Sequence, residues 1–264
     1  MKSVVLFDMD GTITPARQSI EDNMVDTLIE LLKVSEVGIV TGSGFEYVMQ
    51  QCGSFFNSEH DFSKLTILPC NGTQKYIHLG GEWVQHSTLN MREHLGEDFF
   101  RKLMFLLSER MYITHLTHAT CKLPLTGHFI SYRDSLVNWC PIGRSATNGD
   151  RERFIEIDKD RCLRETNMEV FHRTNLCEKV AFAMGGNTSI DIYPMGWDKT
   201  YALNHYENHD HWFVGDRCTA PTGNDKPLYD KIKETKPNQA FEVKTTSDTI
   251  KIIKDIINTL NTKE

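Results

Sequence analysis

The sequence predicts an α/β protein with a Rossmann-like, doubly wound parallel-sheet core. Two observations carry this prediction. Short apolar runs alternate with helical patterns in the first part of the chain, and the same order returns in its last part. Strands and helices in alternation build βαβ units, whose strands run parallel. The core is therefore expected in two separate segments of the sequence.

The first segment contains three expected strands and two expected helices. A strand at 4–8 begins with the apolar run 4–6, as expected of a buried strand. Apolar residues then recur at helical spacing between 25 and 32, after a capping-box pattern of Ser19 with Asp22. The elements expected next are a strand at 37–40, a helix at 45–52 and a short strand at 66–68.

The middle of the chain has a different pattern. A helical pattern at 99–107 precedes two segments of alternating hydrophobicity, 128–133 and 136–140, and a tight turn at 134–135 would join them as a hairpin. Another helix is expected to begin near Asp150. These features indicate an α+β cap domain of antiparallel sheet and helices.

The core pattern resumes after the middle segment. Strands are expected at 212–214 and 240–243, and an amphipathic helix with isoleucines at helical spacing closes the chain at 250–260. We therefore place the first part of the core domain at 1–86, the inserted cap domain at 87–194 and the second part of the core domain at 195–264.

Composition excludes several classes of partner. The 264 residues carry a formal net charge of -7, which argues against nucleic acid. No apolar run reaches membrane-spanning length, and the opening residues lead directly into a strand, so we expect no membrane association, no signal peptide and a cytoplasmic location. The seven cysteines, odd in number and without a C-x-x-C pattern, indicate neither a disulfide framework nor a zinc site.

Two carboxylates, Asp8 and Asp10, follow the first strand, and Gly11 comes directly after them. Because the chain turns where a strand ends, both side chains can face one crevice at the carboxyl edge of the sheet. One carboxylate can attack phosphorus and form an aspartyl-phosphate while the other moves a proton, and glycine lets the backbone approach the phosphate. A solvated acidic turn is the competing interpretation, but turn chemistry alone needs no second carboxylate. The pattern predicts phosphoryl transfer.

Four motifs follow one another in two separate parts of the chain. They are Asp8-Met9-Asp10-Gly11-Thr12, Thr41-Gly42-Ser43, Gly196-Trp197-Asp198-Lys199, and Gly215-Asp216 with Gly223-Asn224-Asp225. Together they resemble the haloacid dehalogenase superfamily of phosphotransferases.

Further segments narrow this resemblance. They are Thr14-Pro15-Ala16-Arg17-Gln18, Pro141-Ile142-Gly143-Arg144-Ser145, Gly185-Gly186-Asn187-Thr188-Ser189-Ile190-Asp191 and Pro194-Met195-Gly196-Trp197-Asp198-Lys199. With the first four motifs, they resemble the eukaryotic-type phosphomannomutase family over essentially the whole chain. The resemblance therefore implies a haloacid dehalogenase-type core with an inserted cap.

The resemblance implies catalytic roles for five residues. Asp8 would be the nucleophile, and Asp10 would act as general acid toward the leaving oxygen and general base toward the accepting hydroxyl. Lys199 would place a positive charge beside the phosphoaspartate. Either Thr41 or Ser43 would donate a hydroxyl hydrogen bond to the phosphoryl group.

The resemblance also implies a magnesium ion. Asp8, the backbone carbonyl of Asp10 and Asp216 would hold it, because hard oxygen ligands suit magnesium. Asn224 and Asp225 would complete its coordination. The ion would neutralise phosphate charge and align the attack.

A mutase also holds the phosphate that it does not transfer. The middle segment supplies Arg133, Arg144 and Arg151, whose planar guanidinium groups can bind phosphate through two hydrogen bonds. For Arg151 an ion-pair face on a helix surface is the competing interpretation. The resemblance adds Ser189 as a donor to the same phosphate, Asp191 as an acceptor from sugar hydroxyls, Asn138 as its neighbour and Arg17 as a contact from the core.

The implied reaction interconverts mannose 6-phosphate and mannose 1-phosphate through a hexose 1,6-bisphosphate, which also acts as activator, and supplies GDP-mannose synthesis. The resemblance further implies a homodimer formed through the cap. A sugar-phosphate phosphatase of the same superfamily is the alternative, although it needs no second phosphate site. A catalytically silent binding protein is disfavoured because Asp8, Asp10, Lys199 and Asp216 are all present.

The sequence departs from the family pattern at two places. Gly44 follows Thr41-Gly42-Ser43, where Gly-Gly-Ser-Asp is expected, so the hydroxyl that contacts phosphate stays open. The loop at 216–225 is one residue longer than expected. That extra residue could shift the second acidic side chain relative to the metal.

Overall fold

The computed structural model describes residues 2–57 and 59–262. The chain divides into two compact units, Met1–Thr88 with Trp197–Glu264 and Leu89–Gly196. We call the first the core unit and the second the inserted unit. The boundaries expected from the sequence, after residues 86 and 194, each lie two residues before the boundaries of these units.

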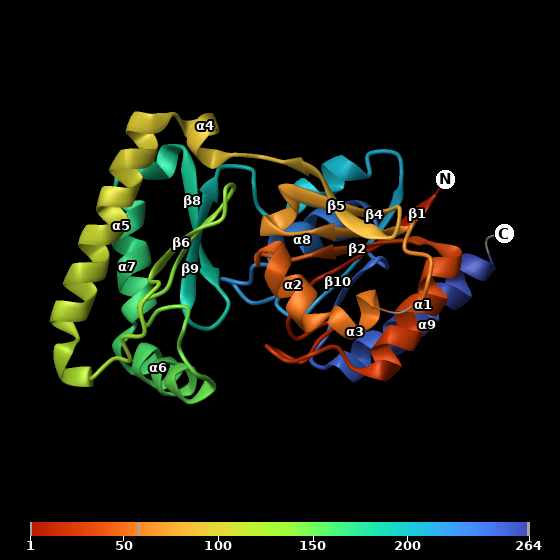
Figure 1. Ribbon diagram of the computed structural model, residues 1–264, viewed down its shortest axis with the longest axis horizontal. Coiled ribbons are helices and arrows are strands. Elements are labelled where there is room, and N and C mark those ends of the chain that lie inside the picture. Colours follow the sequence, from red (N-terminus) through yellow and green to blue (C-terminus); the bar gives the residue numbers. More distant parts are fainter. Residues whose placement is uncertain (1, 58, 263–264) are drawn as a thin grey trace. The chain divides into compact units, whose positions relative to one another are not determined.

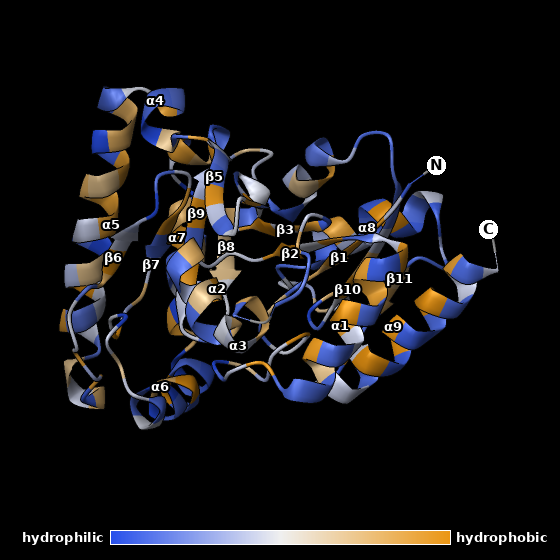
Figure 2. Ribbon diagram, turned by 45° about the vertical axis from the view of Figure 1, so that its right-hand side comes forward, coloured by the Kyte–Doolittle hydropathy of each residue, from blue (hydrophilic) through white to orange (hydrophobic). Residues whose placement is uncertain are grey.

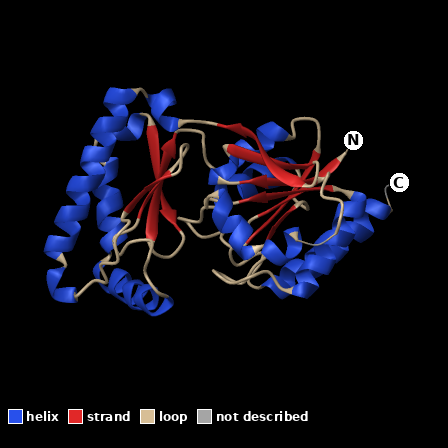
Figure 3. Cartoon of the chain, viewed as in Figure 1, coloured by secondary structure: helices blue, strands red, loops and turns tan. Residues whose placement is uncertain are grey.

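The core unit contains a sheet that is parallel at its centre and antiparallel at one edge. Among the described residues it has seven strands in the order β11-β10-β1-β2-β3-β4-β5, drawn in red in Figure 3. They are β1 (Ser3–Phe7), β2 (Glu36–Val40), β3 (Leu65–Leu68), β4 (Gln74–Leu79), β5 (Glu82–Thr88), β10 (Asp210–Gly215) and β11 (Ala240–Glu242).

Strand β1 is the point at which this sheet changes its winding direction. It pairs in parallel with β2 on one side and with β10 on the other. The chain proceeds from β1 to β2 and β3, and returns much later to β10 and β11 on the opposite side. The carboxyl end of β1 is therefore the topological switch point, where doubly wound sheets bind their ligands.

Alternate residues of β1 enter two different hydrophobic clusters. Val5 and Phe7 pack with residues of α1, α2, α3 and α9, whereas Val4 and Leu6 pack with residues of α8 and the 3-10 segment η4. The two-residue period of a strand thus buries both faces of the sheet. The helical elements of the core unit are α1 (Asp22–Val34), α2 (Phe45–Gln51), α3 (Gly53–Phe56), η1 (Cys70–Gly72), η4 (Lys199–His205), α8 (Lys226–Thr235) and α9 (Thr246–Asn261).

Helices α1 and α9 lie side by side although they come from opposite ends of the chain (Figure 1). Hydrophobic and hydrophilic bands alternate along both helices in Figure 2. Leu28 of α1 and Ile253 of α9 are both fully buried in the same cluster. The closing helix therefore completes the core that the first helix begins.

The inserted unit contains an antiparallel sheet packed against helices. Within the described part of the chain this sheet has four strands in the order β6-β7-β9-β8. Trp139 at its centre is fully buried, donates its indole N–H to the carbonyl of Leu107 on α5 at 3.0 Å and meets the ring of Phe171 on α7 edge-on. The elements of this unit are α4 (Met91–Leu95), α5 (Glu97–Thr117), η2 (Ala119–Cys121), β6 (Ile130–Tyr132), β7 (Val137–Trp139), α6 (Asn148–Arg161), α7 (Leu163–His172), η3 (Asn175–Glu178), β8 (Val180–Gly185) and β9 (Ser189–Pro194).

The predicted fold class is confirmed, with local corrections. The expected capping box at Ser19 is wrong, because Glu21 occupies the N-cap of α1 without a side-chain hydrogen bond. A capping box is present instead at Thr147 and Asp150, at the start of α6. The β4–β5 hairpin was not predicted, because neither strand shows a regular alternation of buried and exposed side chains. The sequence analysis also missed α7, β8 and β9.

Two expectations from composition can be compared with the structure. All seven cysteines are free. Across residues 2–57 and 59–262, no helix is both long and apolar enough to cross a membrane.

We expect Ile253→Ala to lower the free energy of unfolding by about 2–5 kcal/mol, because it opens a cavity between α9 and the sheet. Ile252→Ala removes the same atoms at a partly buried position and should cost less. Urea unfolding of both variants checks this, and equal losses would contradict the packing described for α9.

Candidate active site

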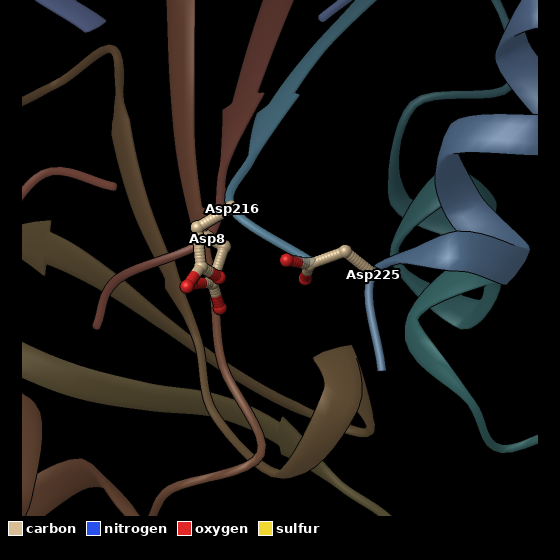
Figure 4. A group of neighbouring side chains, drawn as sticks. All are labelled: Asp8, Asp216 and Asp225. Carbon is tan, nitrogen blue, oxygen red and sulfur yellow. The ribbon is translucent and has the colours of Figure 1, made fainter. Parts of the chain in front are cut away.

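Three carboxylates meet at the carboxyl edge of the core sheet. Asp8 follows β1, Asp216 follows β10, and Asp225 precedes α8. Each offers an oxygen within 4.8 Å of the others, and Figure 4 shows the Asp225 carboxylate directed toward the other two. The amide of Asp8 donates to the carbonyl of Val214 at 3.0 Å, which extends the pairing of β1 with β10 to the site. The switch point of the sheet is therefore strongly acidic.

Lys199 provides the positive charge inside this cluster. Its side chain is 1 % exposed, and its Nζ donates to Asp8 and to Oδ1 of Asp225, the latter at 2.5 Å. The residue begins η4, where Asp198 caps the segment by accepting the amide hydrogen of Thr200 at 2.8 Å. One lysine thus faces three carboxylates, which leaves an excess of negative charge when all of them are ionised.

This charge imbalance shifts the titration of the site. Burial raises the pKa of Asp8 well above its usual range, and the Asp225 charge acts in the same direction. Burial, followed by the charge of Asp225, raises the pKa of Asp216 to about 7. Although burial acts against it, the neighbouring Asp225 and Asp8 carboxylates raise the pKa of Lys199, so the lysine is charged at neutral pH.

The cluster has the features of a site for a hard divalent cation. Its donors are oxygen atoms, as magnesium prefers, and a cation would offset the excess negative charge. Among the described residues, the buried Oδ1 of Asn224 has no hydrogen-bond partner. Gly11 provides the necessary space, since a Cβ at this position would lie 2.6 Å from Oδ2 of Asp216.

The loop at 216–225 is held by Glu242 at the end of β11. The Glu242 carboxylate accepts the amide hydrogens of Cys218 at 2.9 Å and Thr219 at 2.8 Å, and the Thr219 hydroxyl at 2.6 Å. The hydroxyl hydrogen bond from Thr219 is the main cause that lowers the pKa of Glu242. Oδ2 of Asp225 accepts the amide hydrogen of Arg217 at 3.0 Å. Sequence analysis missed Glu242, although it lies at the same carboxyl edge of the sheet.

The Asp10 side chain lies outside the three-carboxylate group. Its Oδ1 accepts the Arg17 amide hydrogen at 2.9 Å and the Tyr47 hydroxyl at 3.0 Å. The contact with Arg17 is made by the backbone, which is in the left-handed region with a φ of 60°. Tyr47 was missed by the sequence analysis, because nothing in a single helical tyrosine indicates a partner 37 residues away.

The hydroxyl residues near Asp8 differ in their environment. Thr41 is buried, and its Oγ1 accepts the amide hydrogen of Ser43 at 3.1 Å. Ser43 is half-buried. The Thr12 hydroxyl approaches Oδ2 of Asp8 at 3.5 Å, and the Thr12 carbonyl accepts a hydrogen bond from Thr249 of α9 at 2.8 Å. Helix α9 thereby fixes the turn that follows Asp8.

In the inserted unit, three arginines lie close enough to affect one another. Burial lowers the pKa of Arg144, and the positive charges of Arg133 and Arg151 act in the same direction. Arg151 is 5 % exposed and donates to Oγ1 of Thr188 at 2.8 Å and to the carbonyl of Arg144 at 3.0 Å. The competing interpretation of Arg151 as a surface ion-pair residue is therefore wrong.

The neighbouring strands supply further buried polar groups. Asn138 and Asp191 face each other in the β7–β9 register, and the Asn138 side-chain amide donates to Oδ1 of Asp191 at 2.6 Å. Oδ1 of Asn138 and Oγ of the fully buried Ser189 have no partner among residues 2–57 and 59–262. Arg164, which sequence analysis missed, donates to the carbonyl of Ser189 at 3.3 Å and pairs with Asp158.

The doubly wound core, the acidic switch point and its buried lysine define a protein of the haloacid dehalogenase type. Two solved structures share the overall fold. The chain superposes on N-terminally truncated Plasmodium falciparum IMP-nucleotidase with a TM-score of 0.63 at 13% identity, covering 97% of this chain and 70% of that one. For Aspergillus fumigatus trehalose-6-phosphate phosphatase the TM-score is 0.53 at 14% identity, and the match covers 97% of this chain and 93% of that one.

Sequence comparison identifies the family within this class. Residues 24–259 match the family model of eukaryotic phosphomannomutase. The chain is 32% identical to the phosphomannomutase of Saccharomyces cerevisiae and 34% identical to that of Schizosaccharomyces pombe, in each case over 97% of this chain and 95% of the relative. It is 32% identical to phosphomannomutase 1 of Mus musculus over 85% of this chain and 82% of the relative. The chain belongs to the eukaryotic phosphomannomutase family.

We expect the metal-free protein to lose stability as the pH rises from about 4 to 7. An aspartate in an unfolded chain has a pKa near about 4, whereas that of Asp216 in the folded chain is about 7. Between these values the folded state binds a proton that the unfolded state does not, so the free energy of unfolding falls with rising pH. Urea unfolding in a chelator at pH 5 and pH 8 measures this slope.

Two variants and the addition of Mg²⁺ test whether Asp216 causes this pH dependence of unfolding. Asp216→Asn should make the slope shallower and leave the contribution of Asp8, whereas Asp26→Asn, on the exposed face of α1, should leave the slope unchanged. Added Mg²⁺ should stabilise the protein more at pH 8 than at pH 5, because it binds the ionised carboxylates. A slope unaffected by Asp216→Asn would contradict the raised pKa.

Proposed function

We propose that this protein is a phosphomannomutase that interconverts mannose 6-phosphate and mannose 1-phosphate through a hexose 1,6-bisphosphate. The observation that carries the proposal is the contact of Lys199 with Asp8 at the switch point of the sheet. Membership of the eukaryotic phosphomannomutase family supplies the substrate class. The product would enter GDP-mannose synthesis.

Asp8 is the proposed nucleophile. Its carboxylate attacks phosphorus, the bond to the sugar oxygen breaks, and an aspartyl-phosphate forms. Lys199 holds the carboxylate in place and stays charged beside the phosphoryl group. Mg²⁺, bound by Asp8, the Asp10 backbone carbonyl, Asp216, Asn224 and Asp225, would supply further neutralisation of the phosphate charge.

Asp10 is the proposed general acid and base. It gives a proton to the departing sugar oxygen and later takes one from the hydroxyl that accepts the phosphoryl group. Of the two candidate hydroxyl donors we favour Thr41, which is buried and fixed by the Ser43 amide. Its own hydroxyl hydrogen has no acceptor within the described part of the chain, so it is available to a phosphoryl oxygen.

Residues of the inserted unit are proposed to bind the phosphate that is not transferred. Arg133 and Arg144 would contact it, together with the unpartnered hydroxyl of Ser189. Arg151 would support them, because it holds both the Arg144 carbonyl and Thr188. Asp191 and Asn138 would bind sugar hydroxyls, and Arg17 would add a contact from the core unit.

A sugar-phosphate phosphatase is the less favoured function. It would use Asp8 and Asp10 in the same way, with water as the acceptor. The cluster of arginines and the unpartnered Ser189 favour a mutase, because hydrolysis of a monophosphate requires no second phosphate site.

We also propose a homodimer formed through the inserted unit, in the cytoplasm. Phe105, Tyr112 and Leu116 recur at helical spacing on α5, with 69%, 67% and 60% of their surfaces exposed. Such a stripe of large apolar side chains could pack against its copy in a second chain.

The mutase reaction itself is the first test. With mannose 1-phosphate, Mg²⁺ and catalytic glucose 1,6-bisphosphate, we expect mannose 6-phosphate to form without matching release of free phosphate. Asp8→Asn should abolish this conversion, since an amide does not attack phosphorus, and the exposed Asp26→Asn should retain it. Free phosphate without isomerisation would assign the protein to the phosphatases.

The phosphate site of the inserted unit has a separate test. We expect Arg144→Gln to lower kcat/KM for the mutase reaction by about 30-fold or more, the loss typical of a buried charged hydrogen bond. Hydrolysis of p-nitrophenyl phosphate, which carries no second phosphate, should change little. Arg101→Gln on the exposed surface of α5 is the matched control. Equal losses with both substrates would remove Arg144 from the phosphate site.

A further inference from the structure

The hydrogen bonds of Asp10 are concentrated on one of its two carboxylate oxygens. Oδ1 accepts the Tyr47 hydroxyl at 3.0 Å and the Arg17 amide hydrogen at 2.9 Å. Oδ2 receives no donor from any residue that the structure describes. The carboxylate is therefore anchored through one oxygen and unoccupied at the other.

Both donors belong to parts of the core unit that are restrained by packing or by backbone conformation. Tyr47 lies in the first turn of α2 and packs against the core cluster. In the same turn, the ring of Phe45 stacks on that of Tyr76, with centroids 3.9 Å apart and planes 8° from parallel. Arg17 presents its amide from a left-handed turn. These restraints fix the direction from which each donor approaches Asp10.

Anchoring one oxygen has a direct consequence for proton transfer. A carboxyl group that turns freely about its Cβ–Cγ bond presents either oxygen to the substrate, whereas an anchored one presents Oδ2 in a fixed direction. The anchor also holds in both protonation states, since Oδ1 still accepts two hydrogen bonds when Oδ2 carries the proton. Such orientation of a reacting group contributes to the rate without contributing to substrate affinity.

We propose that Tyr47 is a positioning residue that holds Asp10 so that Oδ2 transfers the proton in both directions. This proposal rests on the mutase function and on the acid and base role of Asp10. When Asp8 takes the phosphoryl group, the proton on Oδ2 moves to the departing sugar oxygen. When the phosphoryl group leaves Asp8, Oδ2 accepts the proton of the attacking hydroxyl. Tyr47 keeps its own proton throughout.

Two leaving groups show whether Tyr47→Phe disturbs the position of Asp10 or damages the active site in general. A sugar alkoxide leaves only with a proton, so enzyme phosphorylation by glucose 1,6-bisphosphate requires a correctly placed Asp10. A p-nitrophenolate leaves without one. The first-turnover release of p-nitrophenolate, followed by stopped-flow absorbance, therefore reports Asp8 attack alone, and the bisphosphate-dependent mutase rate reports attack together with proton transfer.

We expect Tyr47→Phe to lower kcat for the mutase reaction by about tenfold, the loss of a hydrogen bond to a charged group, with KM for mannose 1-phosphate within twofold of the wild type. The first-turnover release of p-nitrophenolate should stay within twofold. Tyr201→Phe is the matched control, because it removes the same hydroxyl from a tyrosine whose ring packs with Trp197 and His205. That variant should change neither rate.

Each other outcome has a defined meaning. Equal losses with the two substrates, a loss confined to KM, or no loss at all would overturn the positioning role of Tyr47. A wild-type protein that lacks mutase activity would instead overturn the proposed function. The amplitude of the first-turnover release counts the active protein, so kcat referred to that amplitude does not depend on the fraction of folded protein, and the test holds even if Tyr47→Phe is less stable.

Discussion

The contact of one buried lysine with two buried aspartates is the interaction on which the site depends. Lys199 holds Asp8 and Asp225 at the switch point of the sheet, and its charge makes their burial tolerable. An unpaired charge at this depth would cost far more than a hydrogen bond returns. Because three carboxylates face one lysine, the site still favours a cation, and burial together with the charge of Asp225 raises the pKa of Asp216.

The architecture explains why these groups meet. Both faces of the sheet are covered, so the side chains of β1 are used for packing until the strand ends at Phe7. Asp8 is the next residue, and it lies at the switch point, where β1 has β2 as its neighbour on one side and β10 on the other. Glu242 then holds the loop at 216–225 from the end of β11. The catalytic edge is thus assembled from strand ends.

The inserted unit contains a cluster of positive charges in place of the negative charges of the core unit. Arg151 on α6 donates to the backbone carbonyls of Ala146 and Arg144 and to the Thr188 hydroxyl. Burial and the neighbouring positive charges lower the pKa of Arg144, and an anion bound beside it would offset those charges. The unpartnered hydroxyl of Ser189 points to the same ligand chemistry. A phosphate satisfies both requirements, which supports the mutase function over hydrolysis.

The sequence by itself determined the parts that local order encodes. The apolar runs fixed the strands of the doubly wound core, and motif order led to the family through residues such as Asp8, Lys199 and Asp216. The sequence did not decide whether Thr41 or Ser43 contacts the phosphoryl group, and it did not indicate that Tyr47 contacts Asp10. Lys199 reaches Asp8 across 191 residues, and Tyr47 reaches Asp10 across 37. Only the tertiary structure decided these pairings, because strand order and helix packing, which local periodicity does not specify, bring distant side chains within hydrogen-bond distance.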